Sequence, residues 1–239
     1  MAFLHDGTYV VCGMERSGST YAYQVLKALG LNARKSHSYE LGAVGSVKIY
    51  TYRDPRDIIC SYARTKLQAE ISSGELSKTA PGCPREDLRA ACYRLFYRPN
   101  ARQLDYRIYM WEADQGAPVV FIKYEDYFLG NEKALVTQLC DFVSRFENLN
   151  VSESKIDEIL EDCSMEANAA RSREFESFEE WDEATGIHGN HISANGKSTW
   201  REEFDFTIAV CVDRFLGDFL IELEYEKDHA WIEQFAENS

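Results

Sequence analysis

The chain has 239 residues, of which 45% are hydrophobic and 13% aromatic, enough to fill the core of one sizeable α/β domain. This composition argues against a disordered chain, and the formal net charge of −14 argues against binding to nucleic acid or to anionic membranes. Any anion that the protein binds must therefore meet a local basic pocket.

The seven cysteines show neither CxxC nor Cys/His metal spacing. The opening "MAFLHDGTYVVCGM" lacks the features of a signal peptide, and no run is long and apolar enough to cross a bilayer. We therefore expect a cytoplasmic protein with reduced thiols, whose cysteines are buried core residues rather than nucleophiles.

Strand and helix patterns alternate through the first part of the chain. The β-branched run 8–13 predicts a buried strand, and apolar residues at helical spacing over 20–29 predict a helix. A second strand is predicted at 46–53. It precedes a helix that begins with Asp54 as N-cap and Pro55 in the first turn.

The rest of the chain reads mostly helical. A long helical stretch is predicted at 86–114 with a break near Pro99, followed by a third strand that ends at Lys123. Helices are expected from Glu132 onward, the last of them at 207–223.

Strands separated by helices predict an α/β fold with a central, mainly parallel sheet flanked by helices. The absence of a repeat or a long linker predicts a single domain over residues 1–239. The charged clusters "RSREFESFEEWDE" and "EKDHAWIEQFAE" are interpreted as solvated faces rather than sites.

The stretch "GMERSGST" (13–20) joins the first predicted strand to the first predicted helix. The nucleotide-binding pattern G-x-x-x-x-G-K-[ST] has a lysine where this chain has Ser19, and Arg16 stands three positions earlier. Backbone N–H groups and the positive end of the helix dipole would surround an anion there, handled without a metal. The alternative is a Gly/Ser-rich turn that binds nothing.

A second motif is "YRDPRDIICSYART". Arg53 ends a predicted strand and Ser61 follows eight residues later, so both could face a phosphate beside the carboxyl edge of the sheet. The alternative is an ordinary helix start with a surface arginine.

Together these motifs resemble those of the PAPS-dependent sulfotransferases of the cytosolic type. "ERSGSTY" resembles the family's 5′-phosphosulfate loop, PKSGTTW, which also lacks the Walker lysine, and "RDPRDIICS" resembles its 3′-phosphate motif, RNPKDVxxS. "FIKYEDY", "CSMEANA" and "SANGKSTWREEF" are similar to later family segments, in the family's order. The resemblance implies the compact sulfotransferase fold with its P-loop-like strand–loop–helix phosphate site.

The resemblance also implies the chemistry. PAPS would be the co-substrate and PAP the product, with no metal required, and a sulfuryl group would pass in line to a hydroxyl or amine of a small-molecule acceptor. The donor-binding residues carried over are Arg16, Ser17, Gly18, Ser19, Thr20, Tyr21, Arg53, Ser61, Tyr124, Ser164, Met165, Lys197 and Arg201.

Within that set the resemblance implies distinct roles. Arg16 would stabilise charge on the oxygen that leaves with the nucleotide, and Tyr21, which replaces the family's tryptophan, could stack near the adenine. The last motif matches poorly, and Lys197 or Arg201 would supply the positive charge that the family places earlier in it.

"ARKSHSYE" resembles the family's Lys-Thr-His segment, in which the histidine deprotonates the acceptor and the lysine contacts the transferring group. His37 and Lys35 take these positions, in a segment expected to run beside the first strand. Glu40, His188 and His191 are the reserve bases, and the alternative is a surface loop that carries a histidine.

Two other function classes stay open at this point. A P-loop nucleotide kinase-like phosphotransferase would need the missing lysine and a carboxylate for Mg²⁺. A non-catalytic protein that binds PAPS or PAP would lack the base. Arg16 and Arg53 lie only 37 positions apart, less than half the family's usual interval, so the acceptor wall is absent or rebuilt, and neither the acceptor nor the oligomeric state is predicted.

Overall fold

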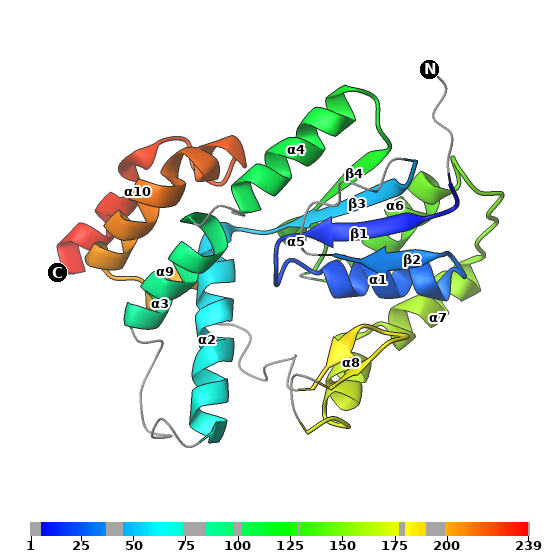
Figure 1. The fold of residues 1–239 in the computed structure, drawn as a ribbon, viewed down its shortest axis with the longest axis horizontal. Helices are drawn as coiled ribbons and strands as arrows, with labels where there is room; N and C mark the ends of the chain where they lie inside the picture. The colour runs from blue at the N-terminus through cyan, green and yellow to red at the C-terminus, as the bar shows by residue number, and fades with distance from the viewer. Residues whose placement is uncertain are drawn as a thin grey trace. The chain divides into compact units, whose positions relative to one another are not determined.

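The computed structural model describes residues 6–36, 45–73, 85–97, 102–128, 130–176, 180–189 and 199–238 (Figure 1). The chain divides into two compact units. Unit 1 consists of Met1–Tyr52 and Tyr106–Ala194, and unit 2 consists of Arg53–Asp105 and Asn195–Ser239. The single domain expected from the sequence stays a prediction.

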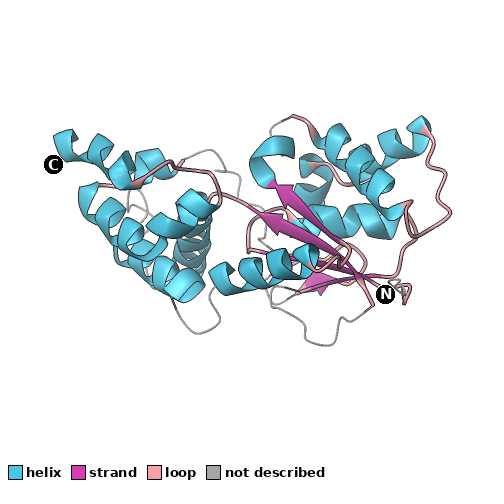
Figure 2. Cartoon of the chain, turned by 90° about the horizontal axis from the view of Figure 1, so that it is seen from above, coloured by secondary structure: helices cyan, strands magenta, loops and turns pink. Residues whose placement is uncertain are grey.

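Unit 1 contains a four-stranded parallel sheet in the order β2-β1-β3-β4 (Figures 1 and 2). Its strands are β1 (Tyr9–Gly13), β2 (Ala33–Lys35), β3 (Val47–Tyr52) and β4 (Val119–Lys123). The central strands β1 and β3 are almost wholly buried, because neighbours lie on both sides of them. The three predicted strands are confirmed, and the segment with Lys35 does run beside the first strand, as β2.

Helices cover both faces of this sheet (Figure 2). The helices of unit 1 are α1 (Ser19–Ala28), most of α4 (Arg102–Asp114), α5 (Tyr124–Tyr127), α6 (Glu132–Val143), α7 (Glu153–Asp162) and α8 (Met165–Ser172). A small antiparallel hairpin follows α8, formed by β5 (Trp181–Asp182) and β6 (Ile187–His188).

The alternation of side chains along β3 explains the two covered faces. Ile49 points to the core that α1, α6 and α7 share, and Leu139 is buried there with it. Tyr50 points the other way and contacts Tyr106 and Tyr109 of α4, with ring centroids 5.8 and 5.0 Å away. The prediction of a parallel sheet flanked by helices is therefore confirmed.

Unit 2 is helical throughout its described residues. It contains α2 (Pro55–Ser73), α3 (Arg85–Cys92), the π-helical turn η1 (Tyr93–Tyr97), the first residues of α4, α9 (Trp200–Glu203), α10 (Phe206–Glu222) and the 3-10 helix η2 (His229–Asn238). The predicted long helix at 86–114 is thus divided into α3, η1 and α4, and Pro99 lies outside the described residues.

One expectation about the C-terminal region is wrong. The cluster "EKDHAWIEQFAE" is not simply a solvated face, because Trp231 and Phe235 are buried against Trp200. The cysteine prediction fares better, since five of the six described cysteines are buried and Cys211 is half-buried.

Among the helices in the described part of the chain, none is both long and apolar enough to cross a membrane.

Candidate functional site

The loop between β1 and α1 takes a shape that few residue types allow. Gly13, Arg16 and Gly18 all have positive φ, of 137°, 62° and 89°. A Cβ on Gly13 would overlap the backbone oxygen of Thr51, so only glycine fits there. The chain therefore leaves the carboxyl end of β1 and turns at once into the first turn of α1, with the N-terminal N–H groups of that helix beside the loop.

Hydrogen bonds fasten this loop to β3. The Met14 N–H donates to the Thr51 carbonyl at 3.0 Å. The Ser17 hydroxyl lies 2.5 Å from the Met14 carbonyl oxygen and 2.7 Å from the Thr51 hydroxyl. Ser17 is fully buried, and its side chain fastens the loop to β3.

Two cationic side chains converge on the loop. The register Val11↔Lys35 places Lys35 on β2 beside β1, and its Nζ donates to the Thr20 hydroxyl at 2.7 Å. Burial and the nearby Arg16 charge lower the pKa of Lys35 to about 8. A Walker loop carries its positive charge on its own lysine. Here Arg16 in the loop and Lys35 on β2 provide positive charge instead.

An aromatic group lies against the same loop. Tyr21 meets the ring of Phe128 edge-on with centroids 5.3 Å apart, and Tyr124 stacks on Phe128 at 4.6 Å. A Cβ on Gly18 would overlap the Phe128 ring, which therefore sits directly on the loop. Sequence analysis missed Phe128, although it follows the Tyr-Glu-Asp-Tyr segment by one residue. The Tyr21 hydroxyl is buried without a hydrogen-bond partner among the described residues, and burial raises its pKa.

Two of the expected donor-binding residues, Ser164 and Met165, lie at the start of α8, and the resemblance implies that they line the adenine. Ser164 is the N-cap of that helix, accepting from the Ala167 N–H at 3.1 Å, and Met165 is 61% exposed. The side-chain amides of Gln24 on α1 and Asn168 on α8 pair at 2.9 and 3.0 Å. This amide pair fastens α8 to the helix that follows the loop.

The predicted bases are only partly described by the structure. His37, Glu40 and His191 lie outside the described residues. His188 is half-buried on β6, where its ring stacks on Trp181 with centroids 5.7 Å apart.

The predicted 3′-phosphate residues belong to unit 2. Arg53 lies 3.7 Å from Asp57, and Asp57 accepts a hydrogen bond from the backbone N–H of Trp200 at 3.1 Å. Burial raises the pKa of Asp57. Sequence analysis overlooked Asp57, whose place four residues after Arg53 on a predicted helix was the available signal.

Two further predicted residues of this unit, Ser61 and Arg201, are described by the structure. Ser61 is half-buried on α2. Arg201 lies over the Trp200 ring, with its guanidinium carbon 4.3 Å from the ring centroid, and Lys197 lies outside the described residues.

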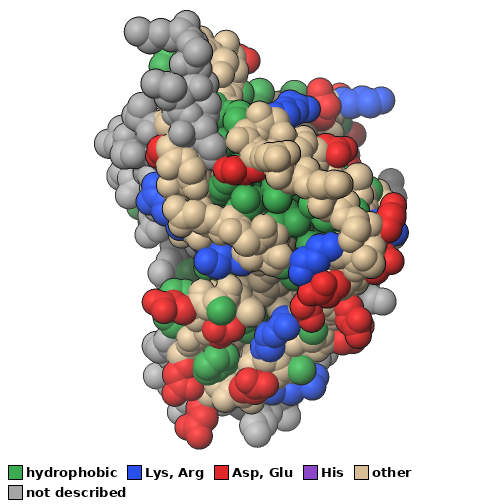
Figure 3. All heavy atoms as spheres, turned by 90° about the vertical axis from the view of Figure 1, so that its right-hand side faces the viewer, with side chains coloured by type: hydrophobic (Ala, Val, Ile, Leu, Met, Phe, Trp, Pro, Cys, Tyr) green, Lys and Arg blue, Asp and Glu red, His purple; other side chains and the backbone are tan. Residues whose placement is uncertain are grey.

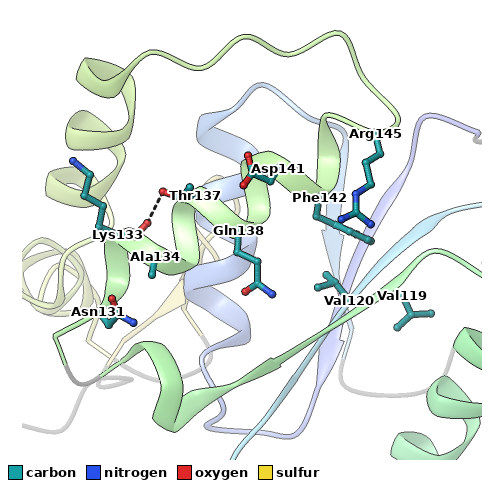
Figure 4. A pocket seen from close by; sticks show the side chains of 10 residues that line it. All are labelled: Val119, Val120, Asn131, Lys133, Ala134, Thr137, Gln138, Asp141, Phe142 and Arg145. Atoms are coloured by element: carbon teal, nitrogen blue, oxygen red, sulfur yellow. Dashed lines mark hydrogen bonds between the residues drawn. The ribbon is translucent and has the colours of Figure 1, made fainter.

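A hollow of about 760 Å³ elsewhere in unit 1 contains none of the predicted site residues (Figure 4). Its lining residues come from β4, α6 and the turns beside α6, and are Val119, Val120, Asn131, Lys133, Ala134, Thr137, Gln138, Asp141, Phe142 and Arg145. Lys133 is already paired with Glu153 and Asp157 at 2.9 and 3.2 Å. The hollow is therefore poorly suited to a phosphorylated ligand.

Charge on the molecular surface is mixed on the face shown in Figure 3, where acidic and basic side chains alternate around exposed hydrophobic ones. Among the residues that the structure describes, no cluster of three or more His, Cys, Asp or Glu could hold a metal ion. The loop beside Arg16 and Lys35 thus stands out by its local positive charge within a chain of net charge −14.

The chain is similar to known proteins of one family. A model of the sulfotransferase domain matches residues 46–227, and no curated protein matches. Retinol dehydratase with androsterone and inactive cofactor PAP is 15% identical, with a TM-score of 0.63 over 91% of this chain and 81% of that one.

Two further solved structures resemble the chain. Retinol dehydratase with retinol and PAP is 15% identical, with a TM-score of 0.62 over 91% of this chain and 82% of that one. The mouse sulfotransferase SULT7A1 with PAP is 12% identical, with a TM-score of 0.57 over 90% of this chain and 84% of that one. These structures share the fold, and the match to the domain model covers most of the sequence: the chain belongs to the sulfotransferase domain family.

Proposed function

We propose that this protein is an enzyme that transfers the sulfuryl group of PAPS to a hydroxyl or amine of a small-molecule acceptor. The observation that carries the proposal is that two cations, Arg16 and Lys35, lie near each other at the loop before α1, where two glycines have positive φ. Family membership supports the reaction class. The similar structures hold PAP, and two of them hold retinol or androsterone, which supports a small-molecule acceptor.

The 5′ end of the donor needs dense positive potential, because both a phosphate and a sulfonate are charged there. Backbone N–H groups of residues 16–20 and the N-terminus of α1 would bind the phosphate. Arg16 and Lys35 would face the charge that grows on the leaving oxygen and on the sulfonate. Arg53 and Ser61 are proposed to bind the 3′-phosphate, and His37 is proposed as the base.

The kinase-like alternative has less support. Ser19 stands at the Walker lysine position, so the loop itself lacks the lysine that such an enzyme needs. A measurement of sulfuryl transfer distinguishes the proposed enzyme from a non-catalytic protein that binds PAPS or PAP.

PAP should raise the melting temperature of the protein without added metal. At a hundredfold excess over its Kd, a ligand adds ~2.7 kcal/mol to the free energy of unfolding. AMP, which lacks the 3′-phosphate, should stabilise much less. Calorimetry in EDTA measures both shifts, and stabilisation by ATP with Mg²⁺ but not by PAP would favour the kinase reading instead.

Arg53→Ala and Arg16→Ala should affect different kinetic constants. The Arg53 contact with phosphate exists in the ground state and the transition state alike, so its loss should raise Kd and KM for the donor. Arg16 acts on charge that develops during transfer, so its loss should lower kcat by roughly 10²-fold. Arg173→Ala on exposed surface is the matched control, and an identical pattern for the two test variants would refute the division of roles.

Affinity for PAP should fall as pH rises above about 8, the pKa of Lys35 in the ligand-free protein. Lys35 is charged below this pH and neutral above it, and the charged form attracts the anionic ligand. Titration calorimetry from pH 7 to 9.5 tests this. Lys35→Met should remove the pH dependence, whereas a slope that persists in the variant would show that another group titrates.

His37→Ala should lower kcat by ~10²–10⁴ while PAP affinity stays within a few-fold. An imidazole of ordinary pKa, ~6.5, is mostly neutral at pH 7 and can accept the acceptor's proton. Steady-state kinetics with radiolabelled PAPS and a panel of acceptors provides the measurement, with His188→Ala as the variant of the alternative base. Full activity in His37→Ala together with loss in His188→Ala would move the base to β6.

A further inference from the structure

Arg56 is a buried charge that the proposed reaction does not use. Its side chain is only 1% exposed, although it lies just inside α2. Burying a guanidinium is costly unless its donors are matched by acceptors, so its surroundings require an explanation.

Each of the three guanidinium nitrogens of Arg56 donates to a carboxylate. The Nε of Arg56 donates to Oδ1 of Asp54 at 3.0 Å and its Nη2 donates to Oδ2 at 2.8 Å, a two-pronged pair. Its Nη1 donates to Oε1 of Glu226 at 2.5 Å. Glu226 follows α10, 170 residues further along the chain, so the C-terminal region reaches back to the start of α2.

Two indole rings also lie close to the guanidinium. Its carbon lies 3.8 Å from the ring centroid of Trp200 and 4.9 Å from that of Trp231. The two indoles meet at 90° with centroids 5.5 Å apart, and Phe235 packs against both. Arg56, Glu226, Trp200 and Trp231 therefore form one closed unit, the Arg56 clamp.

The clamp fixes a turn next to Arg53. Asp54, held by Arg56, accepts the Arg56 N–H at 2.9 Å and its carbonyl accepts the Ile58 N–H at 3.1 Å, which starts α2. Trp200, also in the clamp, donates its N–H to Asp57, the partner of Arg53. Arg53 therefore directly precedes Asp54, which Arg56 holds, and lies beside Asp57, which the Trp200 N–H holds.

We propose that the C-terminal segment 226–235 is a working part of the donor site, because the Arg56 clamp holds Arg53 in the orientation that accepts a 3′-phosphate. Arg56 is a positioning residue in this scheme and does not touch the ligand. The inference rests on the proposed function, since it takes Arg53 as a 3′-phosphate ligand. A buried ion pair is a weak way to gain stability but a strict way to fix geometry, which favours positioning over mere support.

Glu226→Gln tests the scheme, because it keeps the size of the side chain but removes the negative charge that pairs with Arg56. It should weaken PAP binding about tenfold, the effect of losing a charged hydrogen bond. AMP affinity should stay within about twofold, because AMP has no 3′-phosphate for Arg53 to bind. Titration calorimetry on the full chain with PAP and with AMP gives both values.

Two further variants and a control complete the experiment. Arg56→Lys keeps the charge but cannot form the two-pronged pair or cover both indoles, so it should show the same selective loss for PAP. Trp231→Phe should show it to a smaller degree. Glu233→Gln, an exposed residue of the same η2 helix, should leave both affinities unchanged.

The outcomes separate the inference from the proposed function. If PAP and AMP affinities fall together in Glu226→Gln and Arg56→Lys, the clamp only supports the fold and the inference is wrong. Unchanged PAP affinity in both variants overturns it equally. A parent protein that binds no PAP at all refutes the proposed function, and the inference with it.

Discussion

The contact between Gly13 and Thr51 is the constraint on which the candidate site depends. The Thr51 carbonyl accepts the Met14 N–H, its hydroxyl is hydrogen-bonded to the Ser17 hydroxyl, and its backbone oxygen occupies the space that a Cβ at position 13 would need. Because β1 and β3 pair in register at these residues, the loop is fixed to the sheet rather than to solvent. The direction of α1, and with it the direction of its free N–H groups, follows from this close approach.

The net negative charge of the molecule limits where an anion could bind. A chain of net charge −14 repels anions in general, so binding must come from a few local cations and dipoles. Burial, and after it the nearby charge of Arg16, lowers the pKa of Lys35. Two cations held near each other without a ligand are destabilised, and a multiply charged ligand relieves that repulsion when it binds. Where a Walker loop has its lysine this chain has Ser19, and its two nearby cations are Arg16 in the loop and Lys35 on β2.

Sequence patterns predicted the elements that carry their own periodicity. The apolar run of β1 and the helical spacing of α1 and α10 reflect burial on one face, which the residues themselves encode. The hairpin of β5 and β6 escaped prediction because two-residue strands show no period. Arg16 and Arg53 were found as motif residues, whereas the inward turn of the Ser17 hydroxyl and the contact of Phe128 with Gly18 depend on packing between distant segments. The burial of Trp231 was missed for the same reason, since its partner Arg56 lies far away in the sequence.

The two ends of the proposed donor are met by different physical means, and the difference follows from where each group lies. At the 5′ end, the groups proposed to bind are mainly backbone N–H groups, and their orientation is fixed by the fold of unit 1 once Gly13 and Thr51 are in contact. At the 3′ end, Arg53 is a long side chain whose rotamers must be restricted before it can bind tightly. Asp57 restricts them by charge, Asp54 and Arg56 restrict the backbone beside it, and Glu226 holds Arg56 in turn. Backbone donors are oriented by the fold itself, whereas a side-chain donor needs neighbouring side chains to restrict it. In the proposed scheme, that need is met by the buried ion pair at the start of α2, where an apolar residue would satisfy stability alone.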